Sequence, residues 1–221
     1  MKKSTRVLFF SAIGLLFLFL LFTVLVKTVD VAAVGPQGSE IGFSEINKSV
    51  FDALGRSDFW YDLTELFGLV ALASAGCFAV VGLVQLIKRK NLFKVDKCIW
   101  ALAAFYVVVL AFYVLFEIVV VNERPVLVDG VLEASYPSSH TILVSCFLGG
   151  AIIAFCRLVS NKIARGIFAV AMIAIIVLTV VGRLLSGVHW LTDIVGGVIL
   201  SSALVLLLAA VDKWLADKYQ A

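Results

Sequence analysis

The sequence predicts an all-α membrane protein built as a bundle of six transmembrane helices. Of its 221 residues, 62% are hydrophobic, and the mean hydropathy is +1.11, whereas soluble domains have an apolar share nearer half. Six apolar runs are long enough to cross a bilayer as helices. The basic residues lie at the ends of these runs, which indicates lipid headgroups and membrane topology, and no nucleic-acid partner.

The predicted spans cover residues about 7–26, 66–87, 99–121, 137–159, 166–182 and 190–211. The first run follows the basic residues 1–6. A signal peptide is an alternative interpretation of this run, but the run is long for one, and only Val31-Ala32-Ala33 offers a weak cleavage site. We see no internal repeat and expect one domain over residues 1–221.

The polar stretch 27–60 joins the first two spans. Its apolar residues Phe43, Ile46, Val50 and Leu54 recur at spacings of three or four. This pattern predicts a short amphipathic helix that lies at the membrane surface in the first outer loop.

The distribution of Lys and Arg between alternate ends of the spans predicts the topology. One side holds thirteen basic residues and the other holds five, namely Lys27, Lys48, Arg56, Arg124 and Arg183. The positive-inside rule then places both termini in the cytoplasm. The loops that carry the residues discussed below therefore open on the extracytoplasmic face.

The four cysteines indicate neither a metal site nor a disulfide framework. They lie inside apolar runs, without a CxxC pair, at Cys77, Cys98, Cys146 and Cys156. We interpret them as small buried residues.

Residues 183–193 place a guanidinium, an imidazole and a carboxylate between the last two apolar runs. Ionisable groups in such positions usually face a cavity or a partner. His189 and Asp193 are four residues apart, so on a helix they share one face, about 6 Å apart along the axis. A carboxylate there can fix the tautomer of the ring and leave its other nitrogen free for nucleophilic or base chemistry. A purely structural His/Asp pair is the alternative.

Two further segments bring unusual residues to the same predicted face, residues 122–125 and 136–140. Helix N-termini beside His140 and His189 would offer N–H groups and partial positive charge to an anion. We expect Pro137 in the first helical turn, where no N–H is needed. With Arg124 and Arg183, these features predict a phosphate pocket.

The three segments resemble the signature motifs of the type-2 phosphatidic acid phosphatase superfamily, which are integral-membrane lipid phosphate phosphatases. These motifs are written K-x6-R-P, P-S-G-H and S-R-x5-H-x3-D. The matching residues, spread over residues 117–193, are Arg124-Pro125, then Pro137, Ser138 and His140, then Arg183, His189 and Asp193. Six helices with an outward-facing site also fit the family.

The resemblance implies a role for each matched residue. His189 would attack phosphorus, Asp193 would orient it, and His140 would protonate the leaving oxygen. Arg124, Arg183 and Ser138 would bind the phosphoryl oxygens, because phosphoryl transfer depends on positioning and charge stabilisation. We also expect Ser139 among the substrate-binding residues. A phosphohistidine would form and be hydrolysed by water. The resemblance implies no metal and no cofactor.

Three residues depart from the motifs. Ser139 replaces the motif glycine and Gly182 the motif serine, which are small-for-small changes, but Glu117 stands where the family has lysine. A carboxylate at the C-terminal end of a helix meets the negative end of the helix dipole and needs a cation nearby. We therefore expect Glu117 to belong to the substrate pocket and to pair with Arg124 or Arg183. The alternatives are that it recruits a divalent ion or that it faces a neighbouring helix in a structural role.

The sequence thus predicts a multi-pass lipid phosphatase of a bacterial plasma membrane that hydrolyses a phosphomonoester or pyrophosphate. Its partners would be the bilayer and a lipid phosphate such as undecaprenyl pyrophosphate, phosphatidylglycerophosphate or phosphatidic acid. The alternative function is a non-catalytic or weakly active protein that binds or transports lipid phosphates. The sequence leaves the oligomeric state open.

Overall fold

The computed structural model describes residues 2–219, and its helices confirm the predicted all-α class. Their bounds are α1 Lys3–Thr28, α2 Ser44–Leu54, α3 Asp58–Arg89, α4 Lys97–Ile118, α5 Ser139–Leu158, α6 Lys162–Leu185 and α7 Leu191–Tyr219. Two 3-10 turns lie at Pro36–Gly38 and Leu92–Lys94. Six of these helices, all except α2, are long and apolar enough to cross a membrane.

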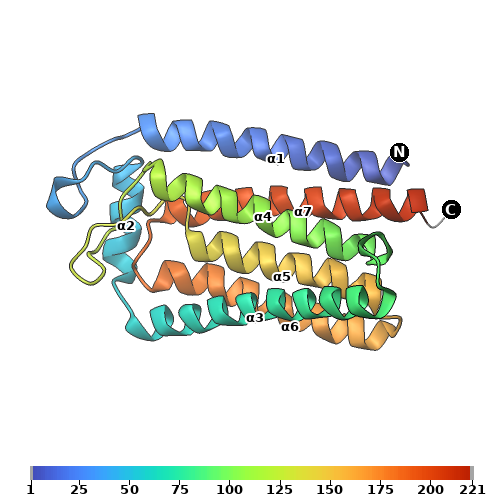
Figure 1. Cartoon of the computed structure of the whole chain (residues 1–221). Coiled ribbons are helices and arrows are strands. Elements are labelled where there is room, and N and C mark those ends of the chain that lie inside the picture. Colours follow the sequence, from blue (N-terminus) through green and yellow to red (C-terminus); the bar gives the residue numbers. More distant parts are fainter. Residues whose placement is uncertain (1, 220–221) are drawn as a thin grey trace.

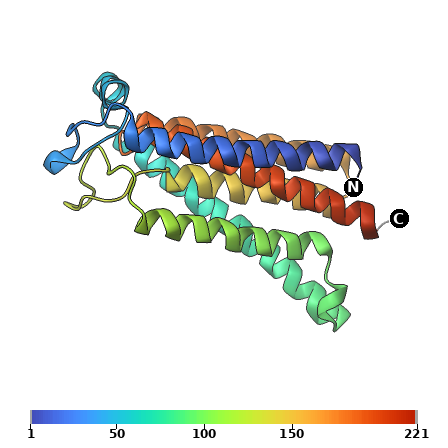
Figure 2. The ribbon, with the colours of Figure 1, turned by 90° about the horizontal axis from the view of Figure 1, so that it is seen from above.

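The six long helices lie side by side with their axes roughly aligned, and α2 lies at one end of the bundle (Figure 1). The loop after α4 and the connection between α6 and α7 are at the same end as α2. The two ends of the chain lie at the opposite end. Seen from above, α4 and the second half of α3 lean away from the other helices (Figure 2).

α5 is the centre of the bundle, because it packs against α3, α4, α6 and α7. Two adjacent glycines allow close packing there. A Cβ at Gly149 would lie 2.9 Å from a methyl group of Val205, and one at Gly150 would lie 2.8 Å from a methyl group of Leu102. Side chains at these two positions would push α7 and α4 away from α5.

The loop between α4 and α5 folds back on itself like a β-hairpin. Backbone hydrogen bonds join the N–H of Arg124 to Glu133 O and the N–H of Ser135 to Asn122 O. Its turn is Asp129-Gly130, where both φ angles are positive, at 50° and 78°. Asp-Gly suits such a turn, because glycine has no Cβ to restrict φ. The loop thereby holds both of its arms over the end of the bundle.

The observed helix ends differ from the predicted spans at two functionally important places. α3 begins at Asp58, not at residue 66. α5 begins at Ser139 with Ser138 as its N-cap, so Pro137 precedes the cap, and its predicted place in the first helical turn is wrong. The Ser138 hydroxyl accepts a hydrogen bond from the N–H of Thr141 and so caps the first turn of α5.

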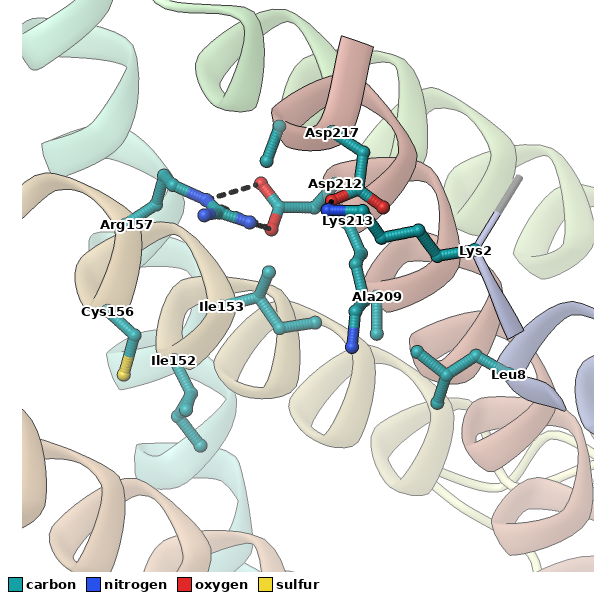
Figure 3. A pocket seen from close by; sticks show the side chains of 11 residues that line it. Lys2, Leu8, Ile152, Ile153, Cys156, Arg157, Ala209, Asp212, Lys213 and Asp217 are labelled. Carbon is teal, nitrogen blue, oxygen red and sulfur yellow. Dashed lines mark hydrogen bonds and ion pairs between the residues drawn. The ribbon is translucent and has the colours of Figure 1, made fainter. Parts of the chain in front are cut away.

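At the end of the bundle that holds the termini, Lys2 and side chains of α1, α5 and α7 line a cavity of about 750 Å³ (Figure 3). Arg157 of α5 pairs with Asp212 of α7, with its Nε 3.2 Å from Oδ2. Lys2, just before α1, pairs with Asp217 at 2.8 Å. These ion pairs link the start and the end of the chain to the centre of the bundle.

Candidate active site

His189 lies in the connection between α6 and α7 and is almost completely buried. Its Nδ1 is 3.8 Å from Oδ2 of Asp193, which is too long for a direct hydrogen bond. The hydroxyl of Ser135 bridges the two, since its Oγ is 3.0 Å from His189 Nδ1 and donates a short hydrogen bond to Asp193 Oδ2. The predicted pairing of imidazole and carboxylate is therefore made through a serine.

Arg183, near the C-terminal end of α6, contacts the other ring nitrogen of His189. Its Nη2 is 3.2 Å from His189 Nε2, and its side chain is fully buried. A guanidinium can only donate, so Nε2 accepts and the ring proton is on Nδ1. The same tautomer is required on the other side of the ring, where Nδ1 donates to Ser135 and Ser135 donates to Asp193. The contacts of the two ring nitrogens are therefore consistent with one tautomer.

The environment of His189 keeps its imidazole neutral. Burial lowers the pKa of His189 well below its ordinary value, and the positive charges of Arg183 and Arg124 lower this pKa further. Burial disfavours the charged ring, and nearby cations do the same. The result is a ring with an available lone pair on Nε2, aimed at a guanidinium.

His140, in the first turn of α5, joins the same group of side chains through a residue of α3. Its Nε2 is 3.2 Å from Oε2 of Glu65, and the other oxygen of Glu65 is 3.1 Å from Nη1 of Arg183. The two histidines are thus connected through one carboxylate and one guanidinium. They lie at the same end of the bundle, as the sequence analysis requires.

Arg124 lies in the hairpin-like loop and is mostly buried. Its Nε is 3.1 Å from Oε2 of Glu133 across the loop. Its charge lies close enough to His189 to lower the pKa of the imidazole. The loop therefore presents this guanidinium to the same end of the bundle as Arg183.

The two serines of the second motif differ in their surroundings. Ser138 is fully buried, caps α5 with its hydroxyl, and donates its backbone N–H to Asp193 O at 3.0 Å. Ser139 is half-buried and lines a small hollow beside Ser135 and Glu117. Ser138 therefore links α5 to α7, while Ser139 remains more accessible.

The expected pairing of Glu117 with Arg124 or Arg183 is wrong. Glu117 is exposed near the end of α4. Arg124 pairs with Glu133, and Arg183 pairs with Glu65. Within residues 2–219, no ion pair includes Glu117, because each of the two guanidinium groups is paired with another carboxylate.

The sequence analysis missed two residues that connect the site. Ser135 immediately precedes Tyr136-Pro137-Ser138, but its bond to Asp193 spans 58 positions along the chain, so no local pattern marks it. Glu65 falls one residue before the predicted second span. An acid inside the longer helix α3 is the signal that could have identified it.

The residues 2–219 contain no group of three or more His, Cys, Asp or Glu side chains placed to hold a metal ion. The positions that the resemblance assigns to phosphate binding carry guanidinium and hydroxyl groups, which bind anions. The absence of a cofactor stays a prediction.

Residues 118–216 match the family model of the PAP2 superfamily. Among solved structures, the chain is similar to one described as the crystal structure of the first transmembrane PAP2 type phosphatidylglycerolphosphate phosphatase from Bacillus subtilis. The two share 19% sequence identity and align with a TM-score of 0.60, over 94% of this chain and 96% of that chain. No curated protein matches this chain. The match of residues 118–216 to the family model and the shared fold both agree with the resemblance seen in the three motifs.

Proposed function

We propose that this protein is a membrane phosphatase that hydrolyses a lipid phosphomonoester or pyrophosphate through a phosphohistidine. One observation carries the proposal: a buried, neutral imidazole whose Nε2 accepts from Arg183 and whose Nδ1 leads through Ser135 to Asp193. A nucleophile, its orienting group and a guanidinium for phosphate thus lie within hydrogen-bond reach of one another.

In the first step, Nε2 of His189 attacks phosphorus and forms an N–P bond. The bond between phosphorus and the leaving oxygen breaks, and that oxygen takes a proton from His140. The positive charge that develops on His189 is stabilised through Ser135 by Asp193. Arg183 and Arg124 would bind the phosphoryl oxygens, with Ser138 and Ser139 at the start of α5, because guanidinium groups match phosphate oxygens in geometry and charge.

In the second step, water attacks the phosphohistidine. His140, now neutral, takes a proton from that water as the new P–O bond forms. The N–P bond breaks, inorganic phosphate leaves, and His189 returns to its neutral state. One difficult displacement is thereby replaced by two easier ones.

The structure also supports a substrate with a hydrocarbon chain. An apolar groove of about 780 Å³ runs between α5, α6 and α7. Val181 and Val198, which line it, stand on the same two helices as Arg183 and Asp193. A chain in this groove would leave its phosphate near the end of the bundle that holds the site.

We further propose that the site opens outside a bacterial plasma membrane and that both termini are cytoplasmic. The support is the excess of basic residues at the ends of the helices opposite the site, thirteen against five. Such an excess faces the cytoplasm in most multi-pass proteins. The candidate substrates all present a phosphate at the depth of a bilayer surface.

A trapping experiment tests the chemistry. Purified protein mixed with a phosphate-labelled lipid and quenched rapidly should carry label that is stable in base and labile in acid, as expected for phosphohistidine. His189→Ala should abolish both the label and phosphate release while lipid binding persists. Phosphate release that survives in His189→Ala would contradict the proposal, and binding without release by the unaltered protein would favour the non-catalytic alternative.

The substrate is tested by measuring phosphate release from undecaprenyl pyrophosphate, phosphatidylglycerophosphate and phosphatidic acid under the same conditions. Each lipid is compared with a short-chain form of equal headgroup. If the groove binds the chain, kcat/KM should rise with chain length for the preferred headgroup, since each buried methylene contributes about 0.8 kcal/mol. Equal values for long and short chains would remove the groove from the proposal.

A further inference from the structure

One face of α3 forms a wall of the candidate site that the three motifs do not include. Thr64 and Glu65 are neighbours in the chain, and each lies three or four residues from Tyr61 and from Gly68, so the four residues share a face of this helix. All four contact or adjoin Arg183 or His140. This segment also lies outside residues 118–216, the part that matches the family model.

Glu65 is the charged group of this face, and it holds two functional side chains at once. One carboxylate oxygen is 3.2 Å from His140 Nε2, and the other is 3.1 Å from Arg183 Nη1. The Glu65 side chain is 42% exposed, whereas that of Arg183 is fully buried. The carboxylate therefore connects the buried guanidinium to the more accessible end of the site.

The neighbours of Glu65 shape the space around these two partners. A Cβ at Gly68 would lie 3.2 Å from both Nε2 and Cδ2 of His140, so glycine leaves the room that the imidazole occupies. The Tyr61 ring lies 5.3 Å from Cζ of Arg183 as a cation–π contact. Thr64 Oγ1 accepts from Nη1 of Arg183 at 3.3 Å. The helix face is thus complementary to both groups.

We propose that Glu65 is a positioning residue that orients His140 for proton transfer to the leaving group. A carboxylate bonded to an imidazole fixes the orientation of the ring and stabilises its positive charge. Both effects matter when His140 gives its proton to the oxygen that departs from phosphorus. This inference rests on the proposed function, and it concerns the acid step of that reaction.

The dependence of the rate on the leaving group separates this role from simple structural support. An alkyl alcohol is a poor leaving group, so its oxygen needs a proton while the P–O bond breaks. A nitrophenol leaves readily without one. Loss of a group that supports the acid step therefore slows phosphoryl transfer from the alkyl ester to His189 and spares that transfer from the nitrophenyl ester. Because the hydrolysis of the phosphohistidine that follows also uses His140 and is common to both esters, the quantity to compare is the rate of leaving-group release in a single turnover.

The experiment compares purified unaltered protein with Glu65→Gln, Glu65→Ala and Gly68→Ala on two esters of matched chain length, dodecyl phosphate and 4-dodecyl-2-nitrophenyl phosphate. In a single turnover we expect the rate of alcohol release from the alkyl ester to fall by at least about a hundredfold, which is the lower end of the usual contribution of general acids. For nitrophenol release from the nitrophenyl ester in a single turnover we expect a loss below about threefold, and KM should change little on either ester. Gly68→Ala should show the same pattern, because the methyl group displaces the His140 ring while Glu65 stays in place.

Asp62→Asn is the matched control, since Asp62 is an exposed acid on the same helix, one turn before Glu65. It should leave both rates unchanged. Equal losses on the two esters, a change in KM alone, or faster hydrolysis by Glu65→Ala would overturn the inference. If the Glu65 variants give one of these outcomes while His189→Ala is inactive, the inference on Glu65 is overturned and the proposed function stands. An unaltered protein that cleaves neither ester nor any lipid would overturn both.

Discussion

At the scale of single residues, the site is held together by side chains that each serve two partners. Ser135 joins His189 to Asp193, and Glu65 joins His140 to Arg183. A group with two fixed partners has little freedom to rotate, so the imidazole rings are oriented before a substrate arrives. In the proposed reaction, such preorganisation would lower the cost of aligning His189 with phosphorus.

We predict that Ser135→Ala slows the enzyme without changing substrate binding. The variant removes the link between His189 and Asp193, whose atoms are 3.8 Å apart. A hydrogen bond to a charged group contributes about 1.5–3 kcal/mol, so kcat should fall between about tenfold and about a hundredfold. Steady-state kinetics on the preferred lipid measures this.

The comparison variant is Asp193→Asn, which keeps the hydrogen-bonding shape and removes the charge. If the serine is the relay, Ser135→Ala and Asp193→Asn should both lower kcat, and the double variant should lose less than the product of the two single effects. Independent, multiplicative losses would show that the serine does not act through the carboxylate.

The residues that spacing alone predicts at this scale are those of one short segment. His189 and Asp193 are four apart, and Arg183 stands six residues before His189 at the end of α6, so the chain itself keeps them close. Glu65 and Ser135 come from α3 and from the hairpin-like loop. Their contacts depend on how helices pack, which no local spacing encodes.

At the scale of elements, α7 is fixed at the end that carries Asp193. Asn47 of α2 is fully buried, and it donates to Thr192 Oγ1 at 2.9 Å and accepts from the N–H of Thr192 at 3.1 Å. It also donates to Gly42 O at 2.8 Å. The first turn of a helix has N–H groups without partners in the helix, and here another helix supplies one.

We predict that Asn47→Ala destabilises the protein and lowers activity with it. The change leaves buried polar groups on Thr192 and Gly42 without partners, at a cost of about 1–3 kcal/mol for each. Thermal unfolding in detergent should show a lower midpoint, and the position of Asp193 should become less defined. Lys48→Ala is the control, because Lys48 makes an exposed ion pair with Asp52, of little value. Equal midpoints for the two variants would contradict the docking role of Asn47.

The elements were more predictable than their contacts. Long apolar runs identify the spanning helices, since no other stretch of the chain is both long and apolar enough to cross a bilayer. The period of three to four residues also predicts α2, which the structure places at Ser44–Leu54. It does not predict that α2 buries Ser44 and Asn47 while Ile46 and Leu54 remain 49% and 44% exposed. That arrangement follows from hydrogen bonds of Asn47 to α7 and of Ser44 to Asp30, which sequence periodicity does not contain.

At the scale of the whole molecule, the candidate site and the chain termini lie at opposite ends of the bundle (Figure 1). A helix rises about 1.5 Å per residue, so a helix with the 29 residues of α7 is about 44 Å long. This length matches the full thickness of a bilayer with its headgroups. The two ends of the bundle therefore reach opposite membrane surfaces.

We predict that reporters at the two ends report opposite compartments. A fluorescent protein fused after residue 221 should fluoresce in cells, and alkaline phosphatase at the same place should be inactive, because the positive-inside rule puts this end in the cytoplasm. The same reporters inserted at the Asp129-Gly130 turn should behave in the reverse way. Fluorescence at the turn together with phosphatase activity at the tail would invert the proposed topology.

The two ends of the chain lie far from the candidate site and are joined to each other by an ion pair, and this has a practical consequence. Because Lys2 and Asp217 are joined, both ends leave the bundle side by side. If either end is coupled to a surface, a bead or a scaffold protein, the candidate site at the other end of the bundle points away from the support. Immobilised preparations should therefore keep full access to lipid vesicles added from solution.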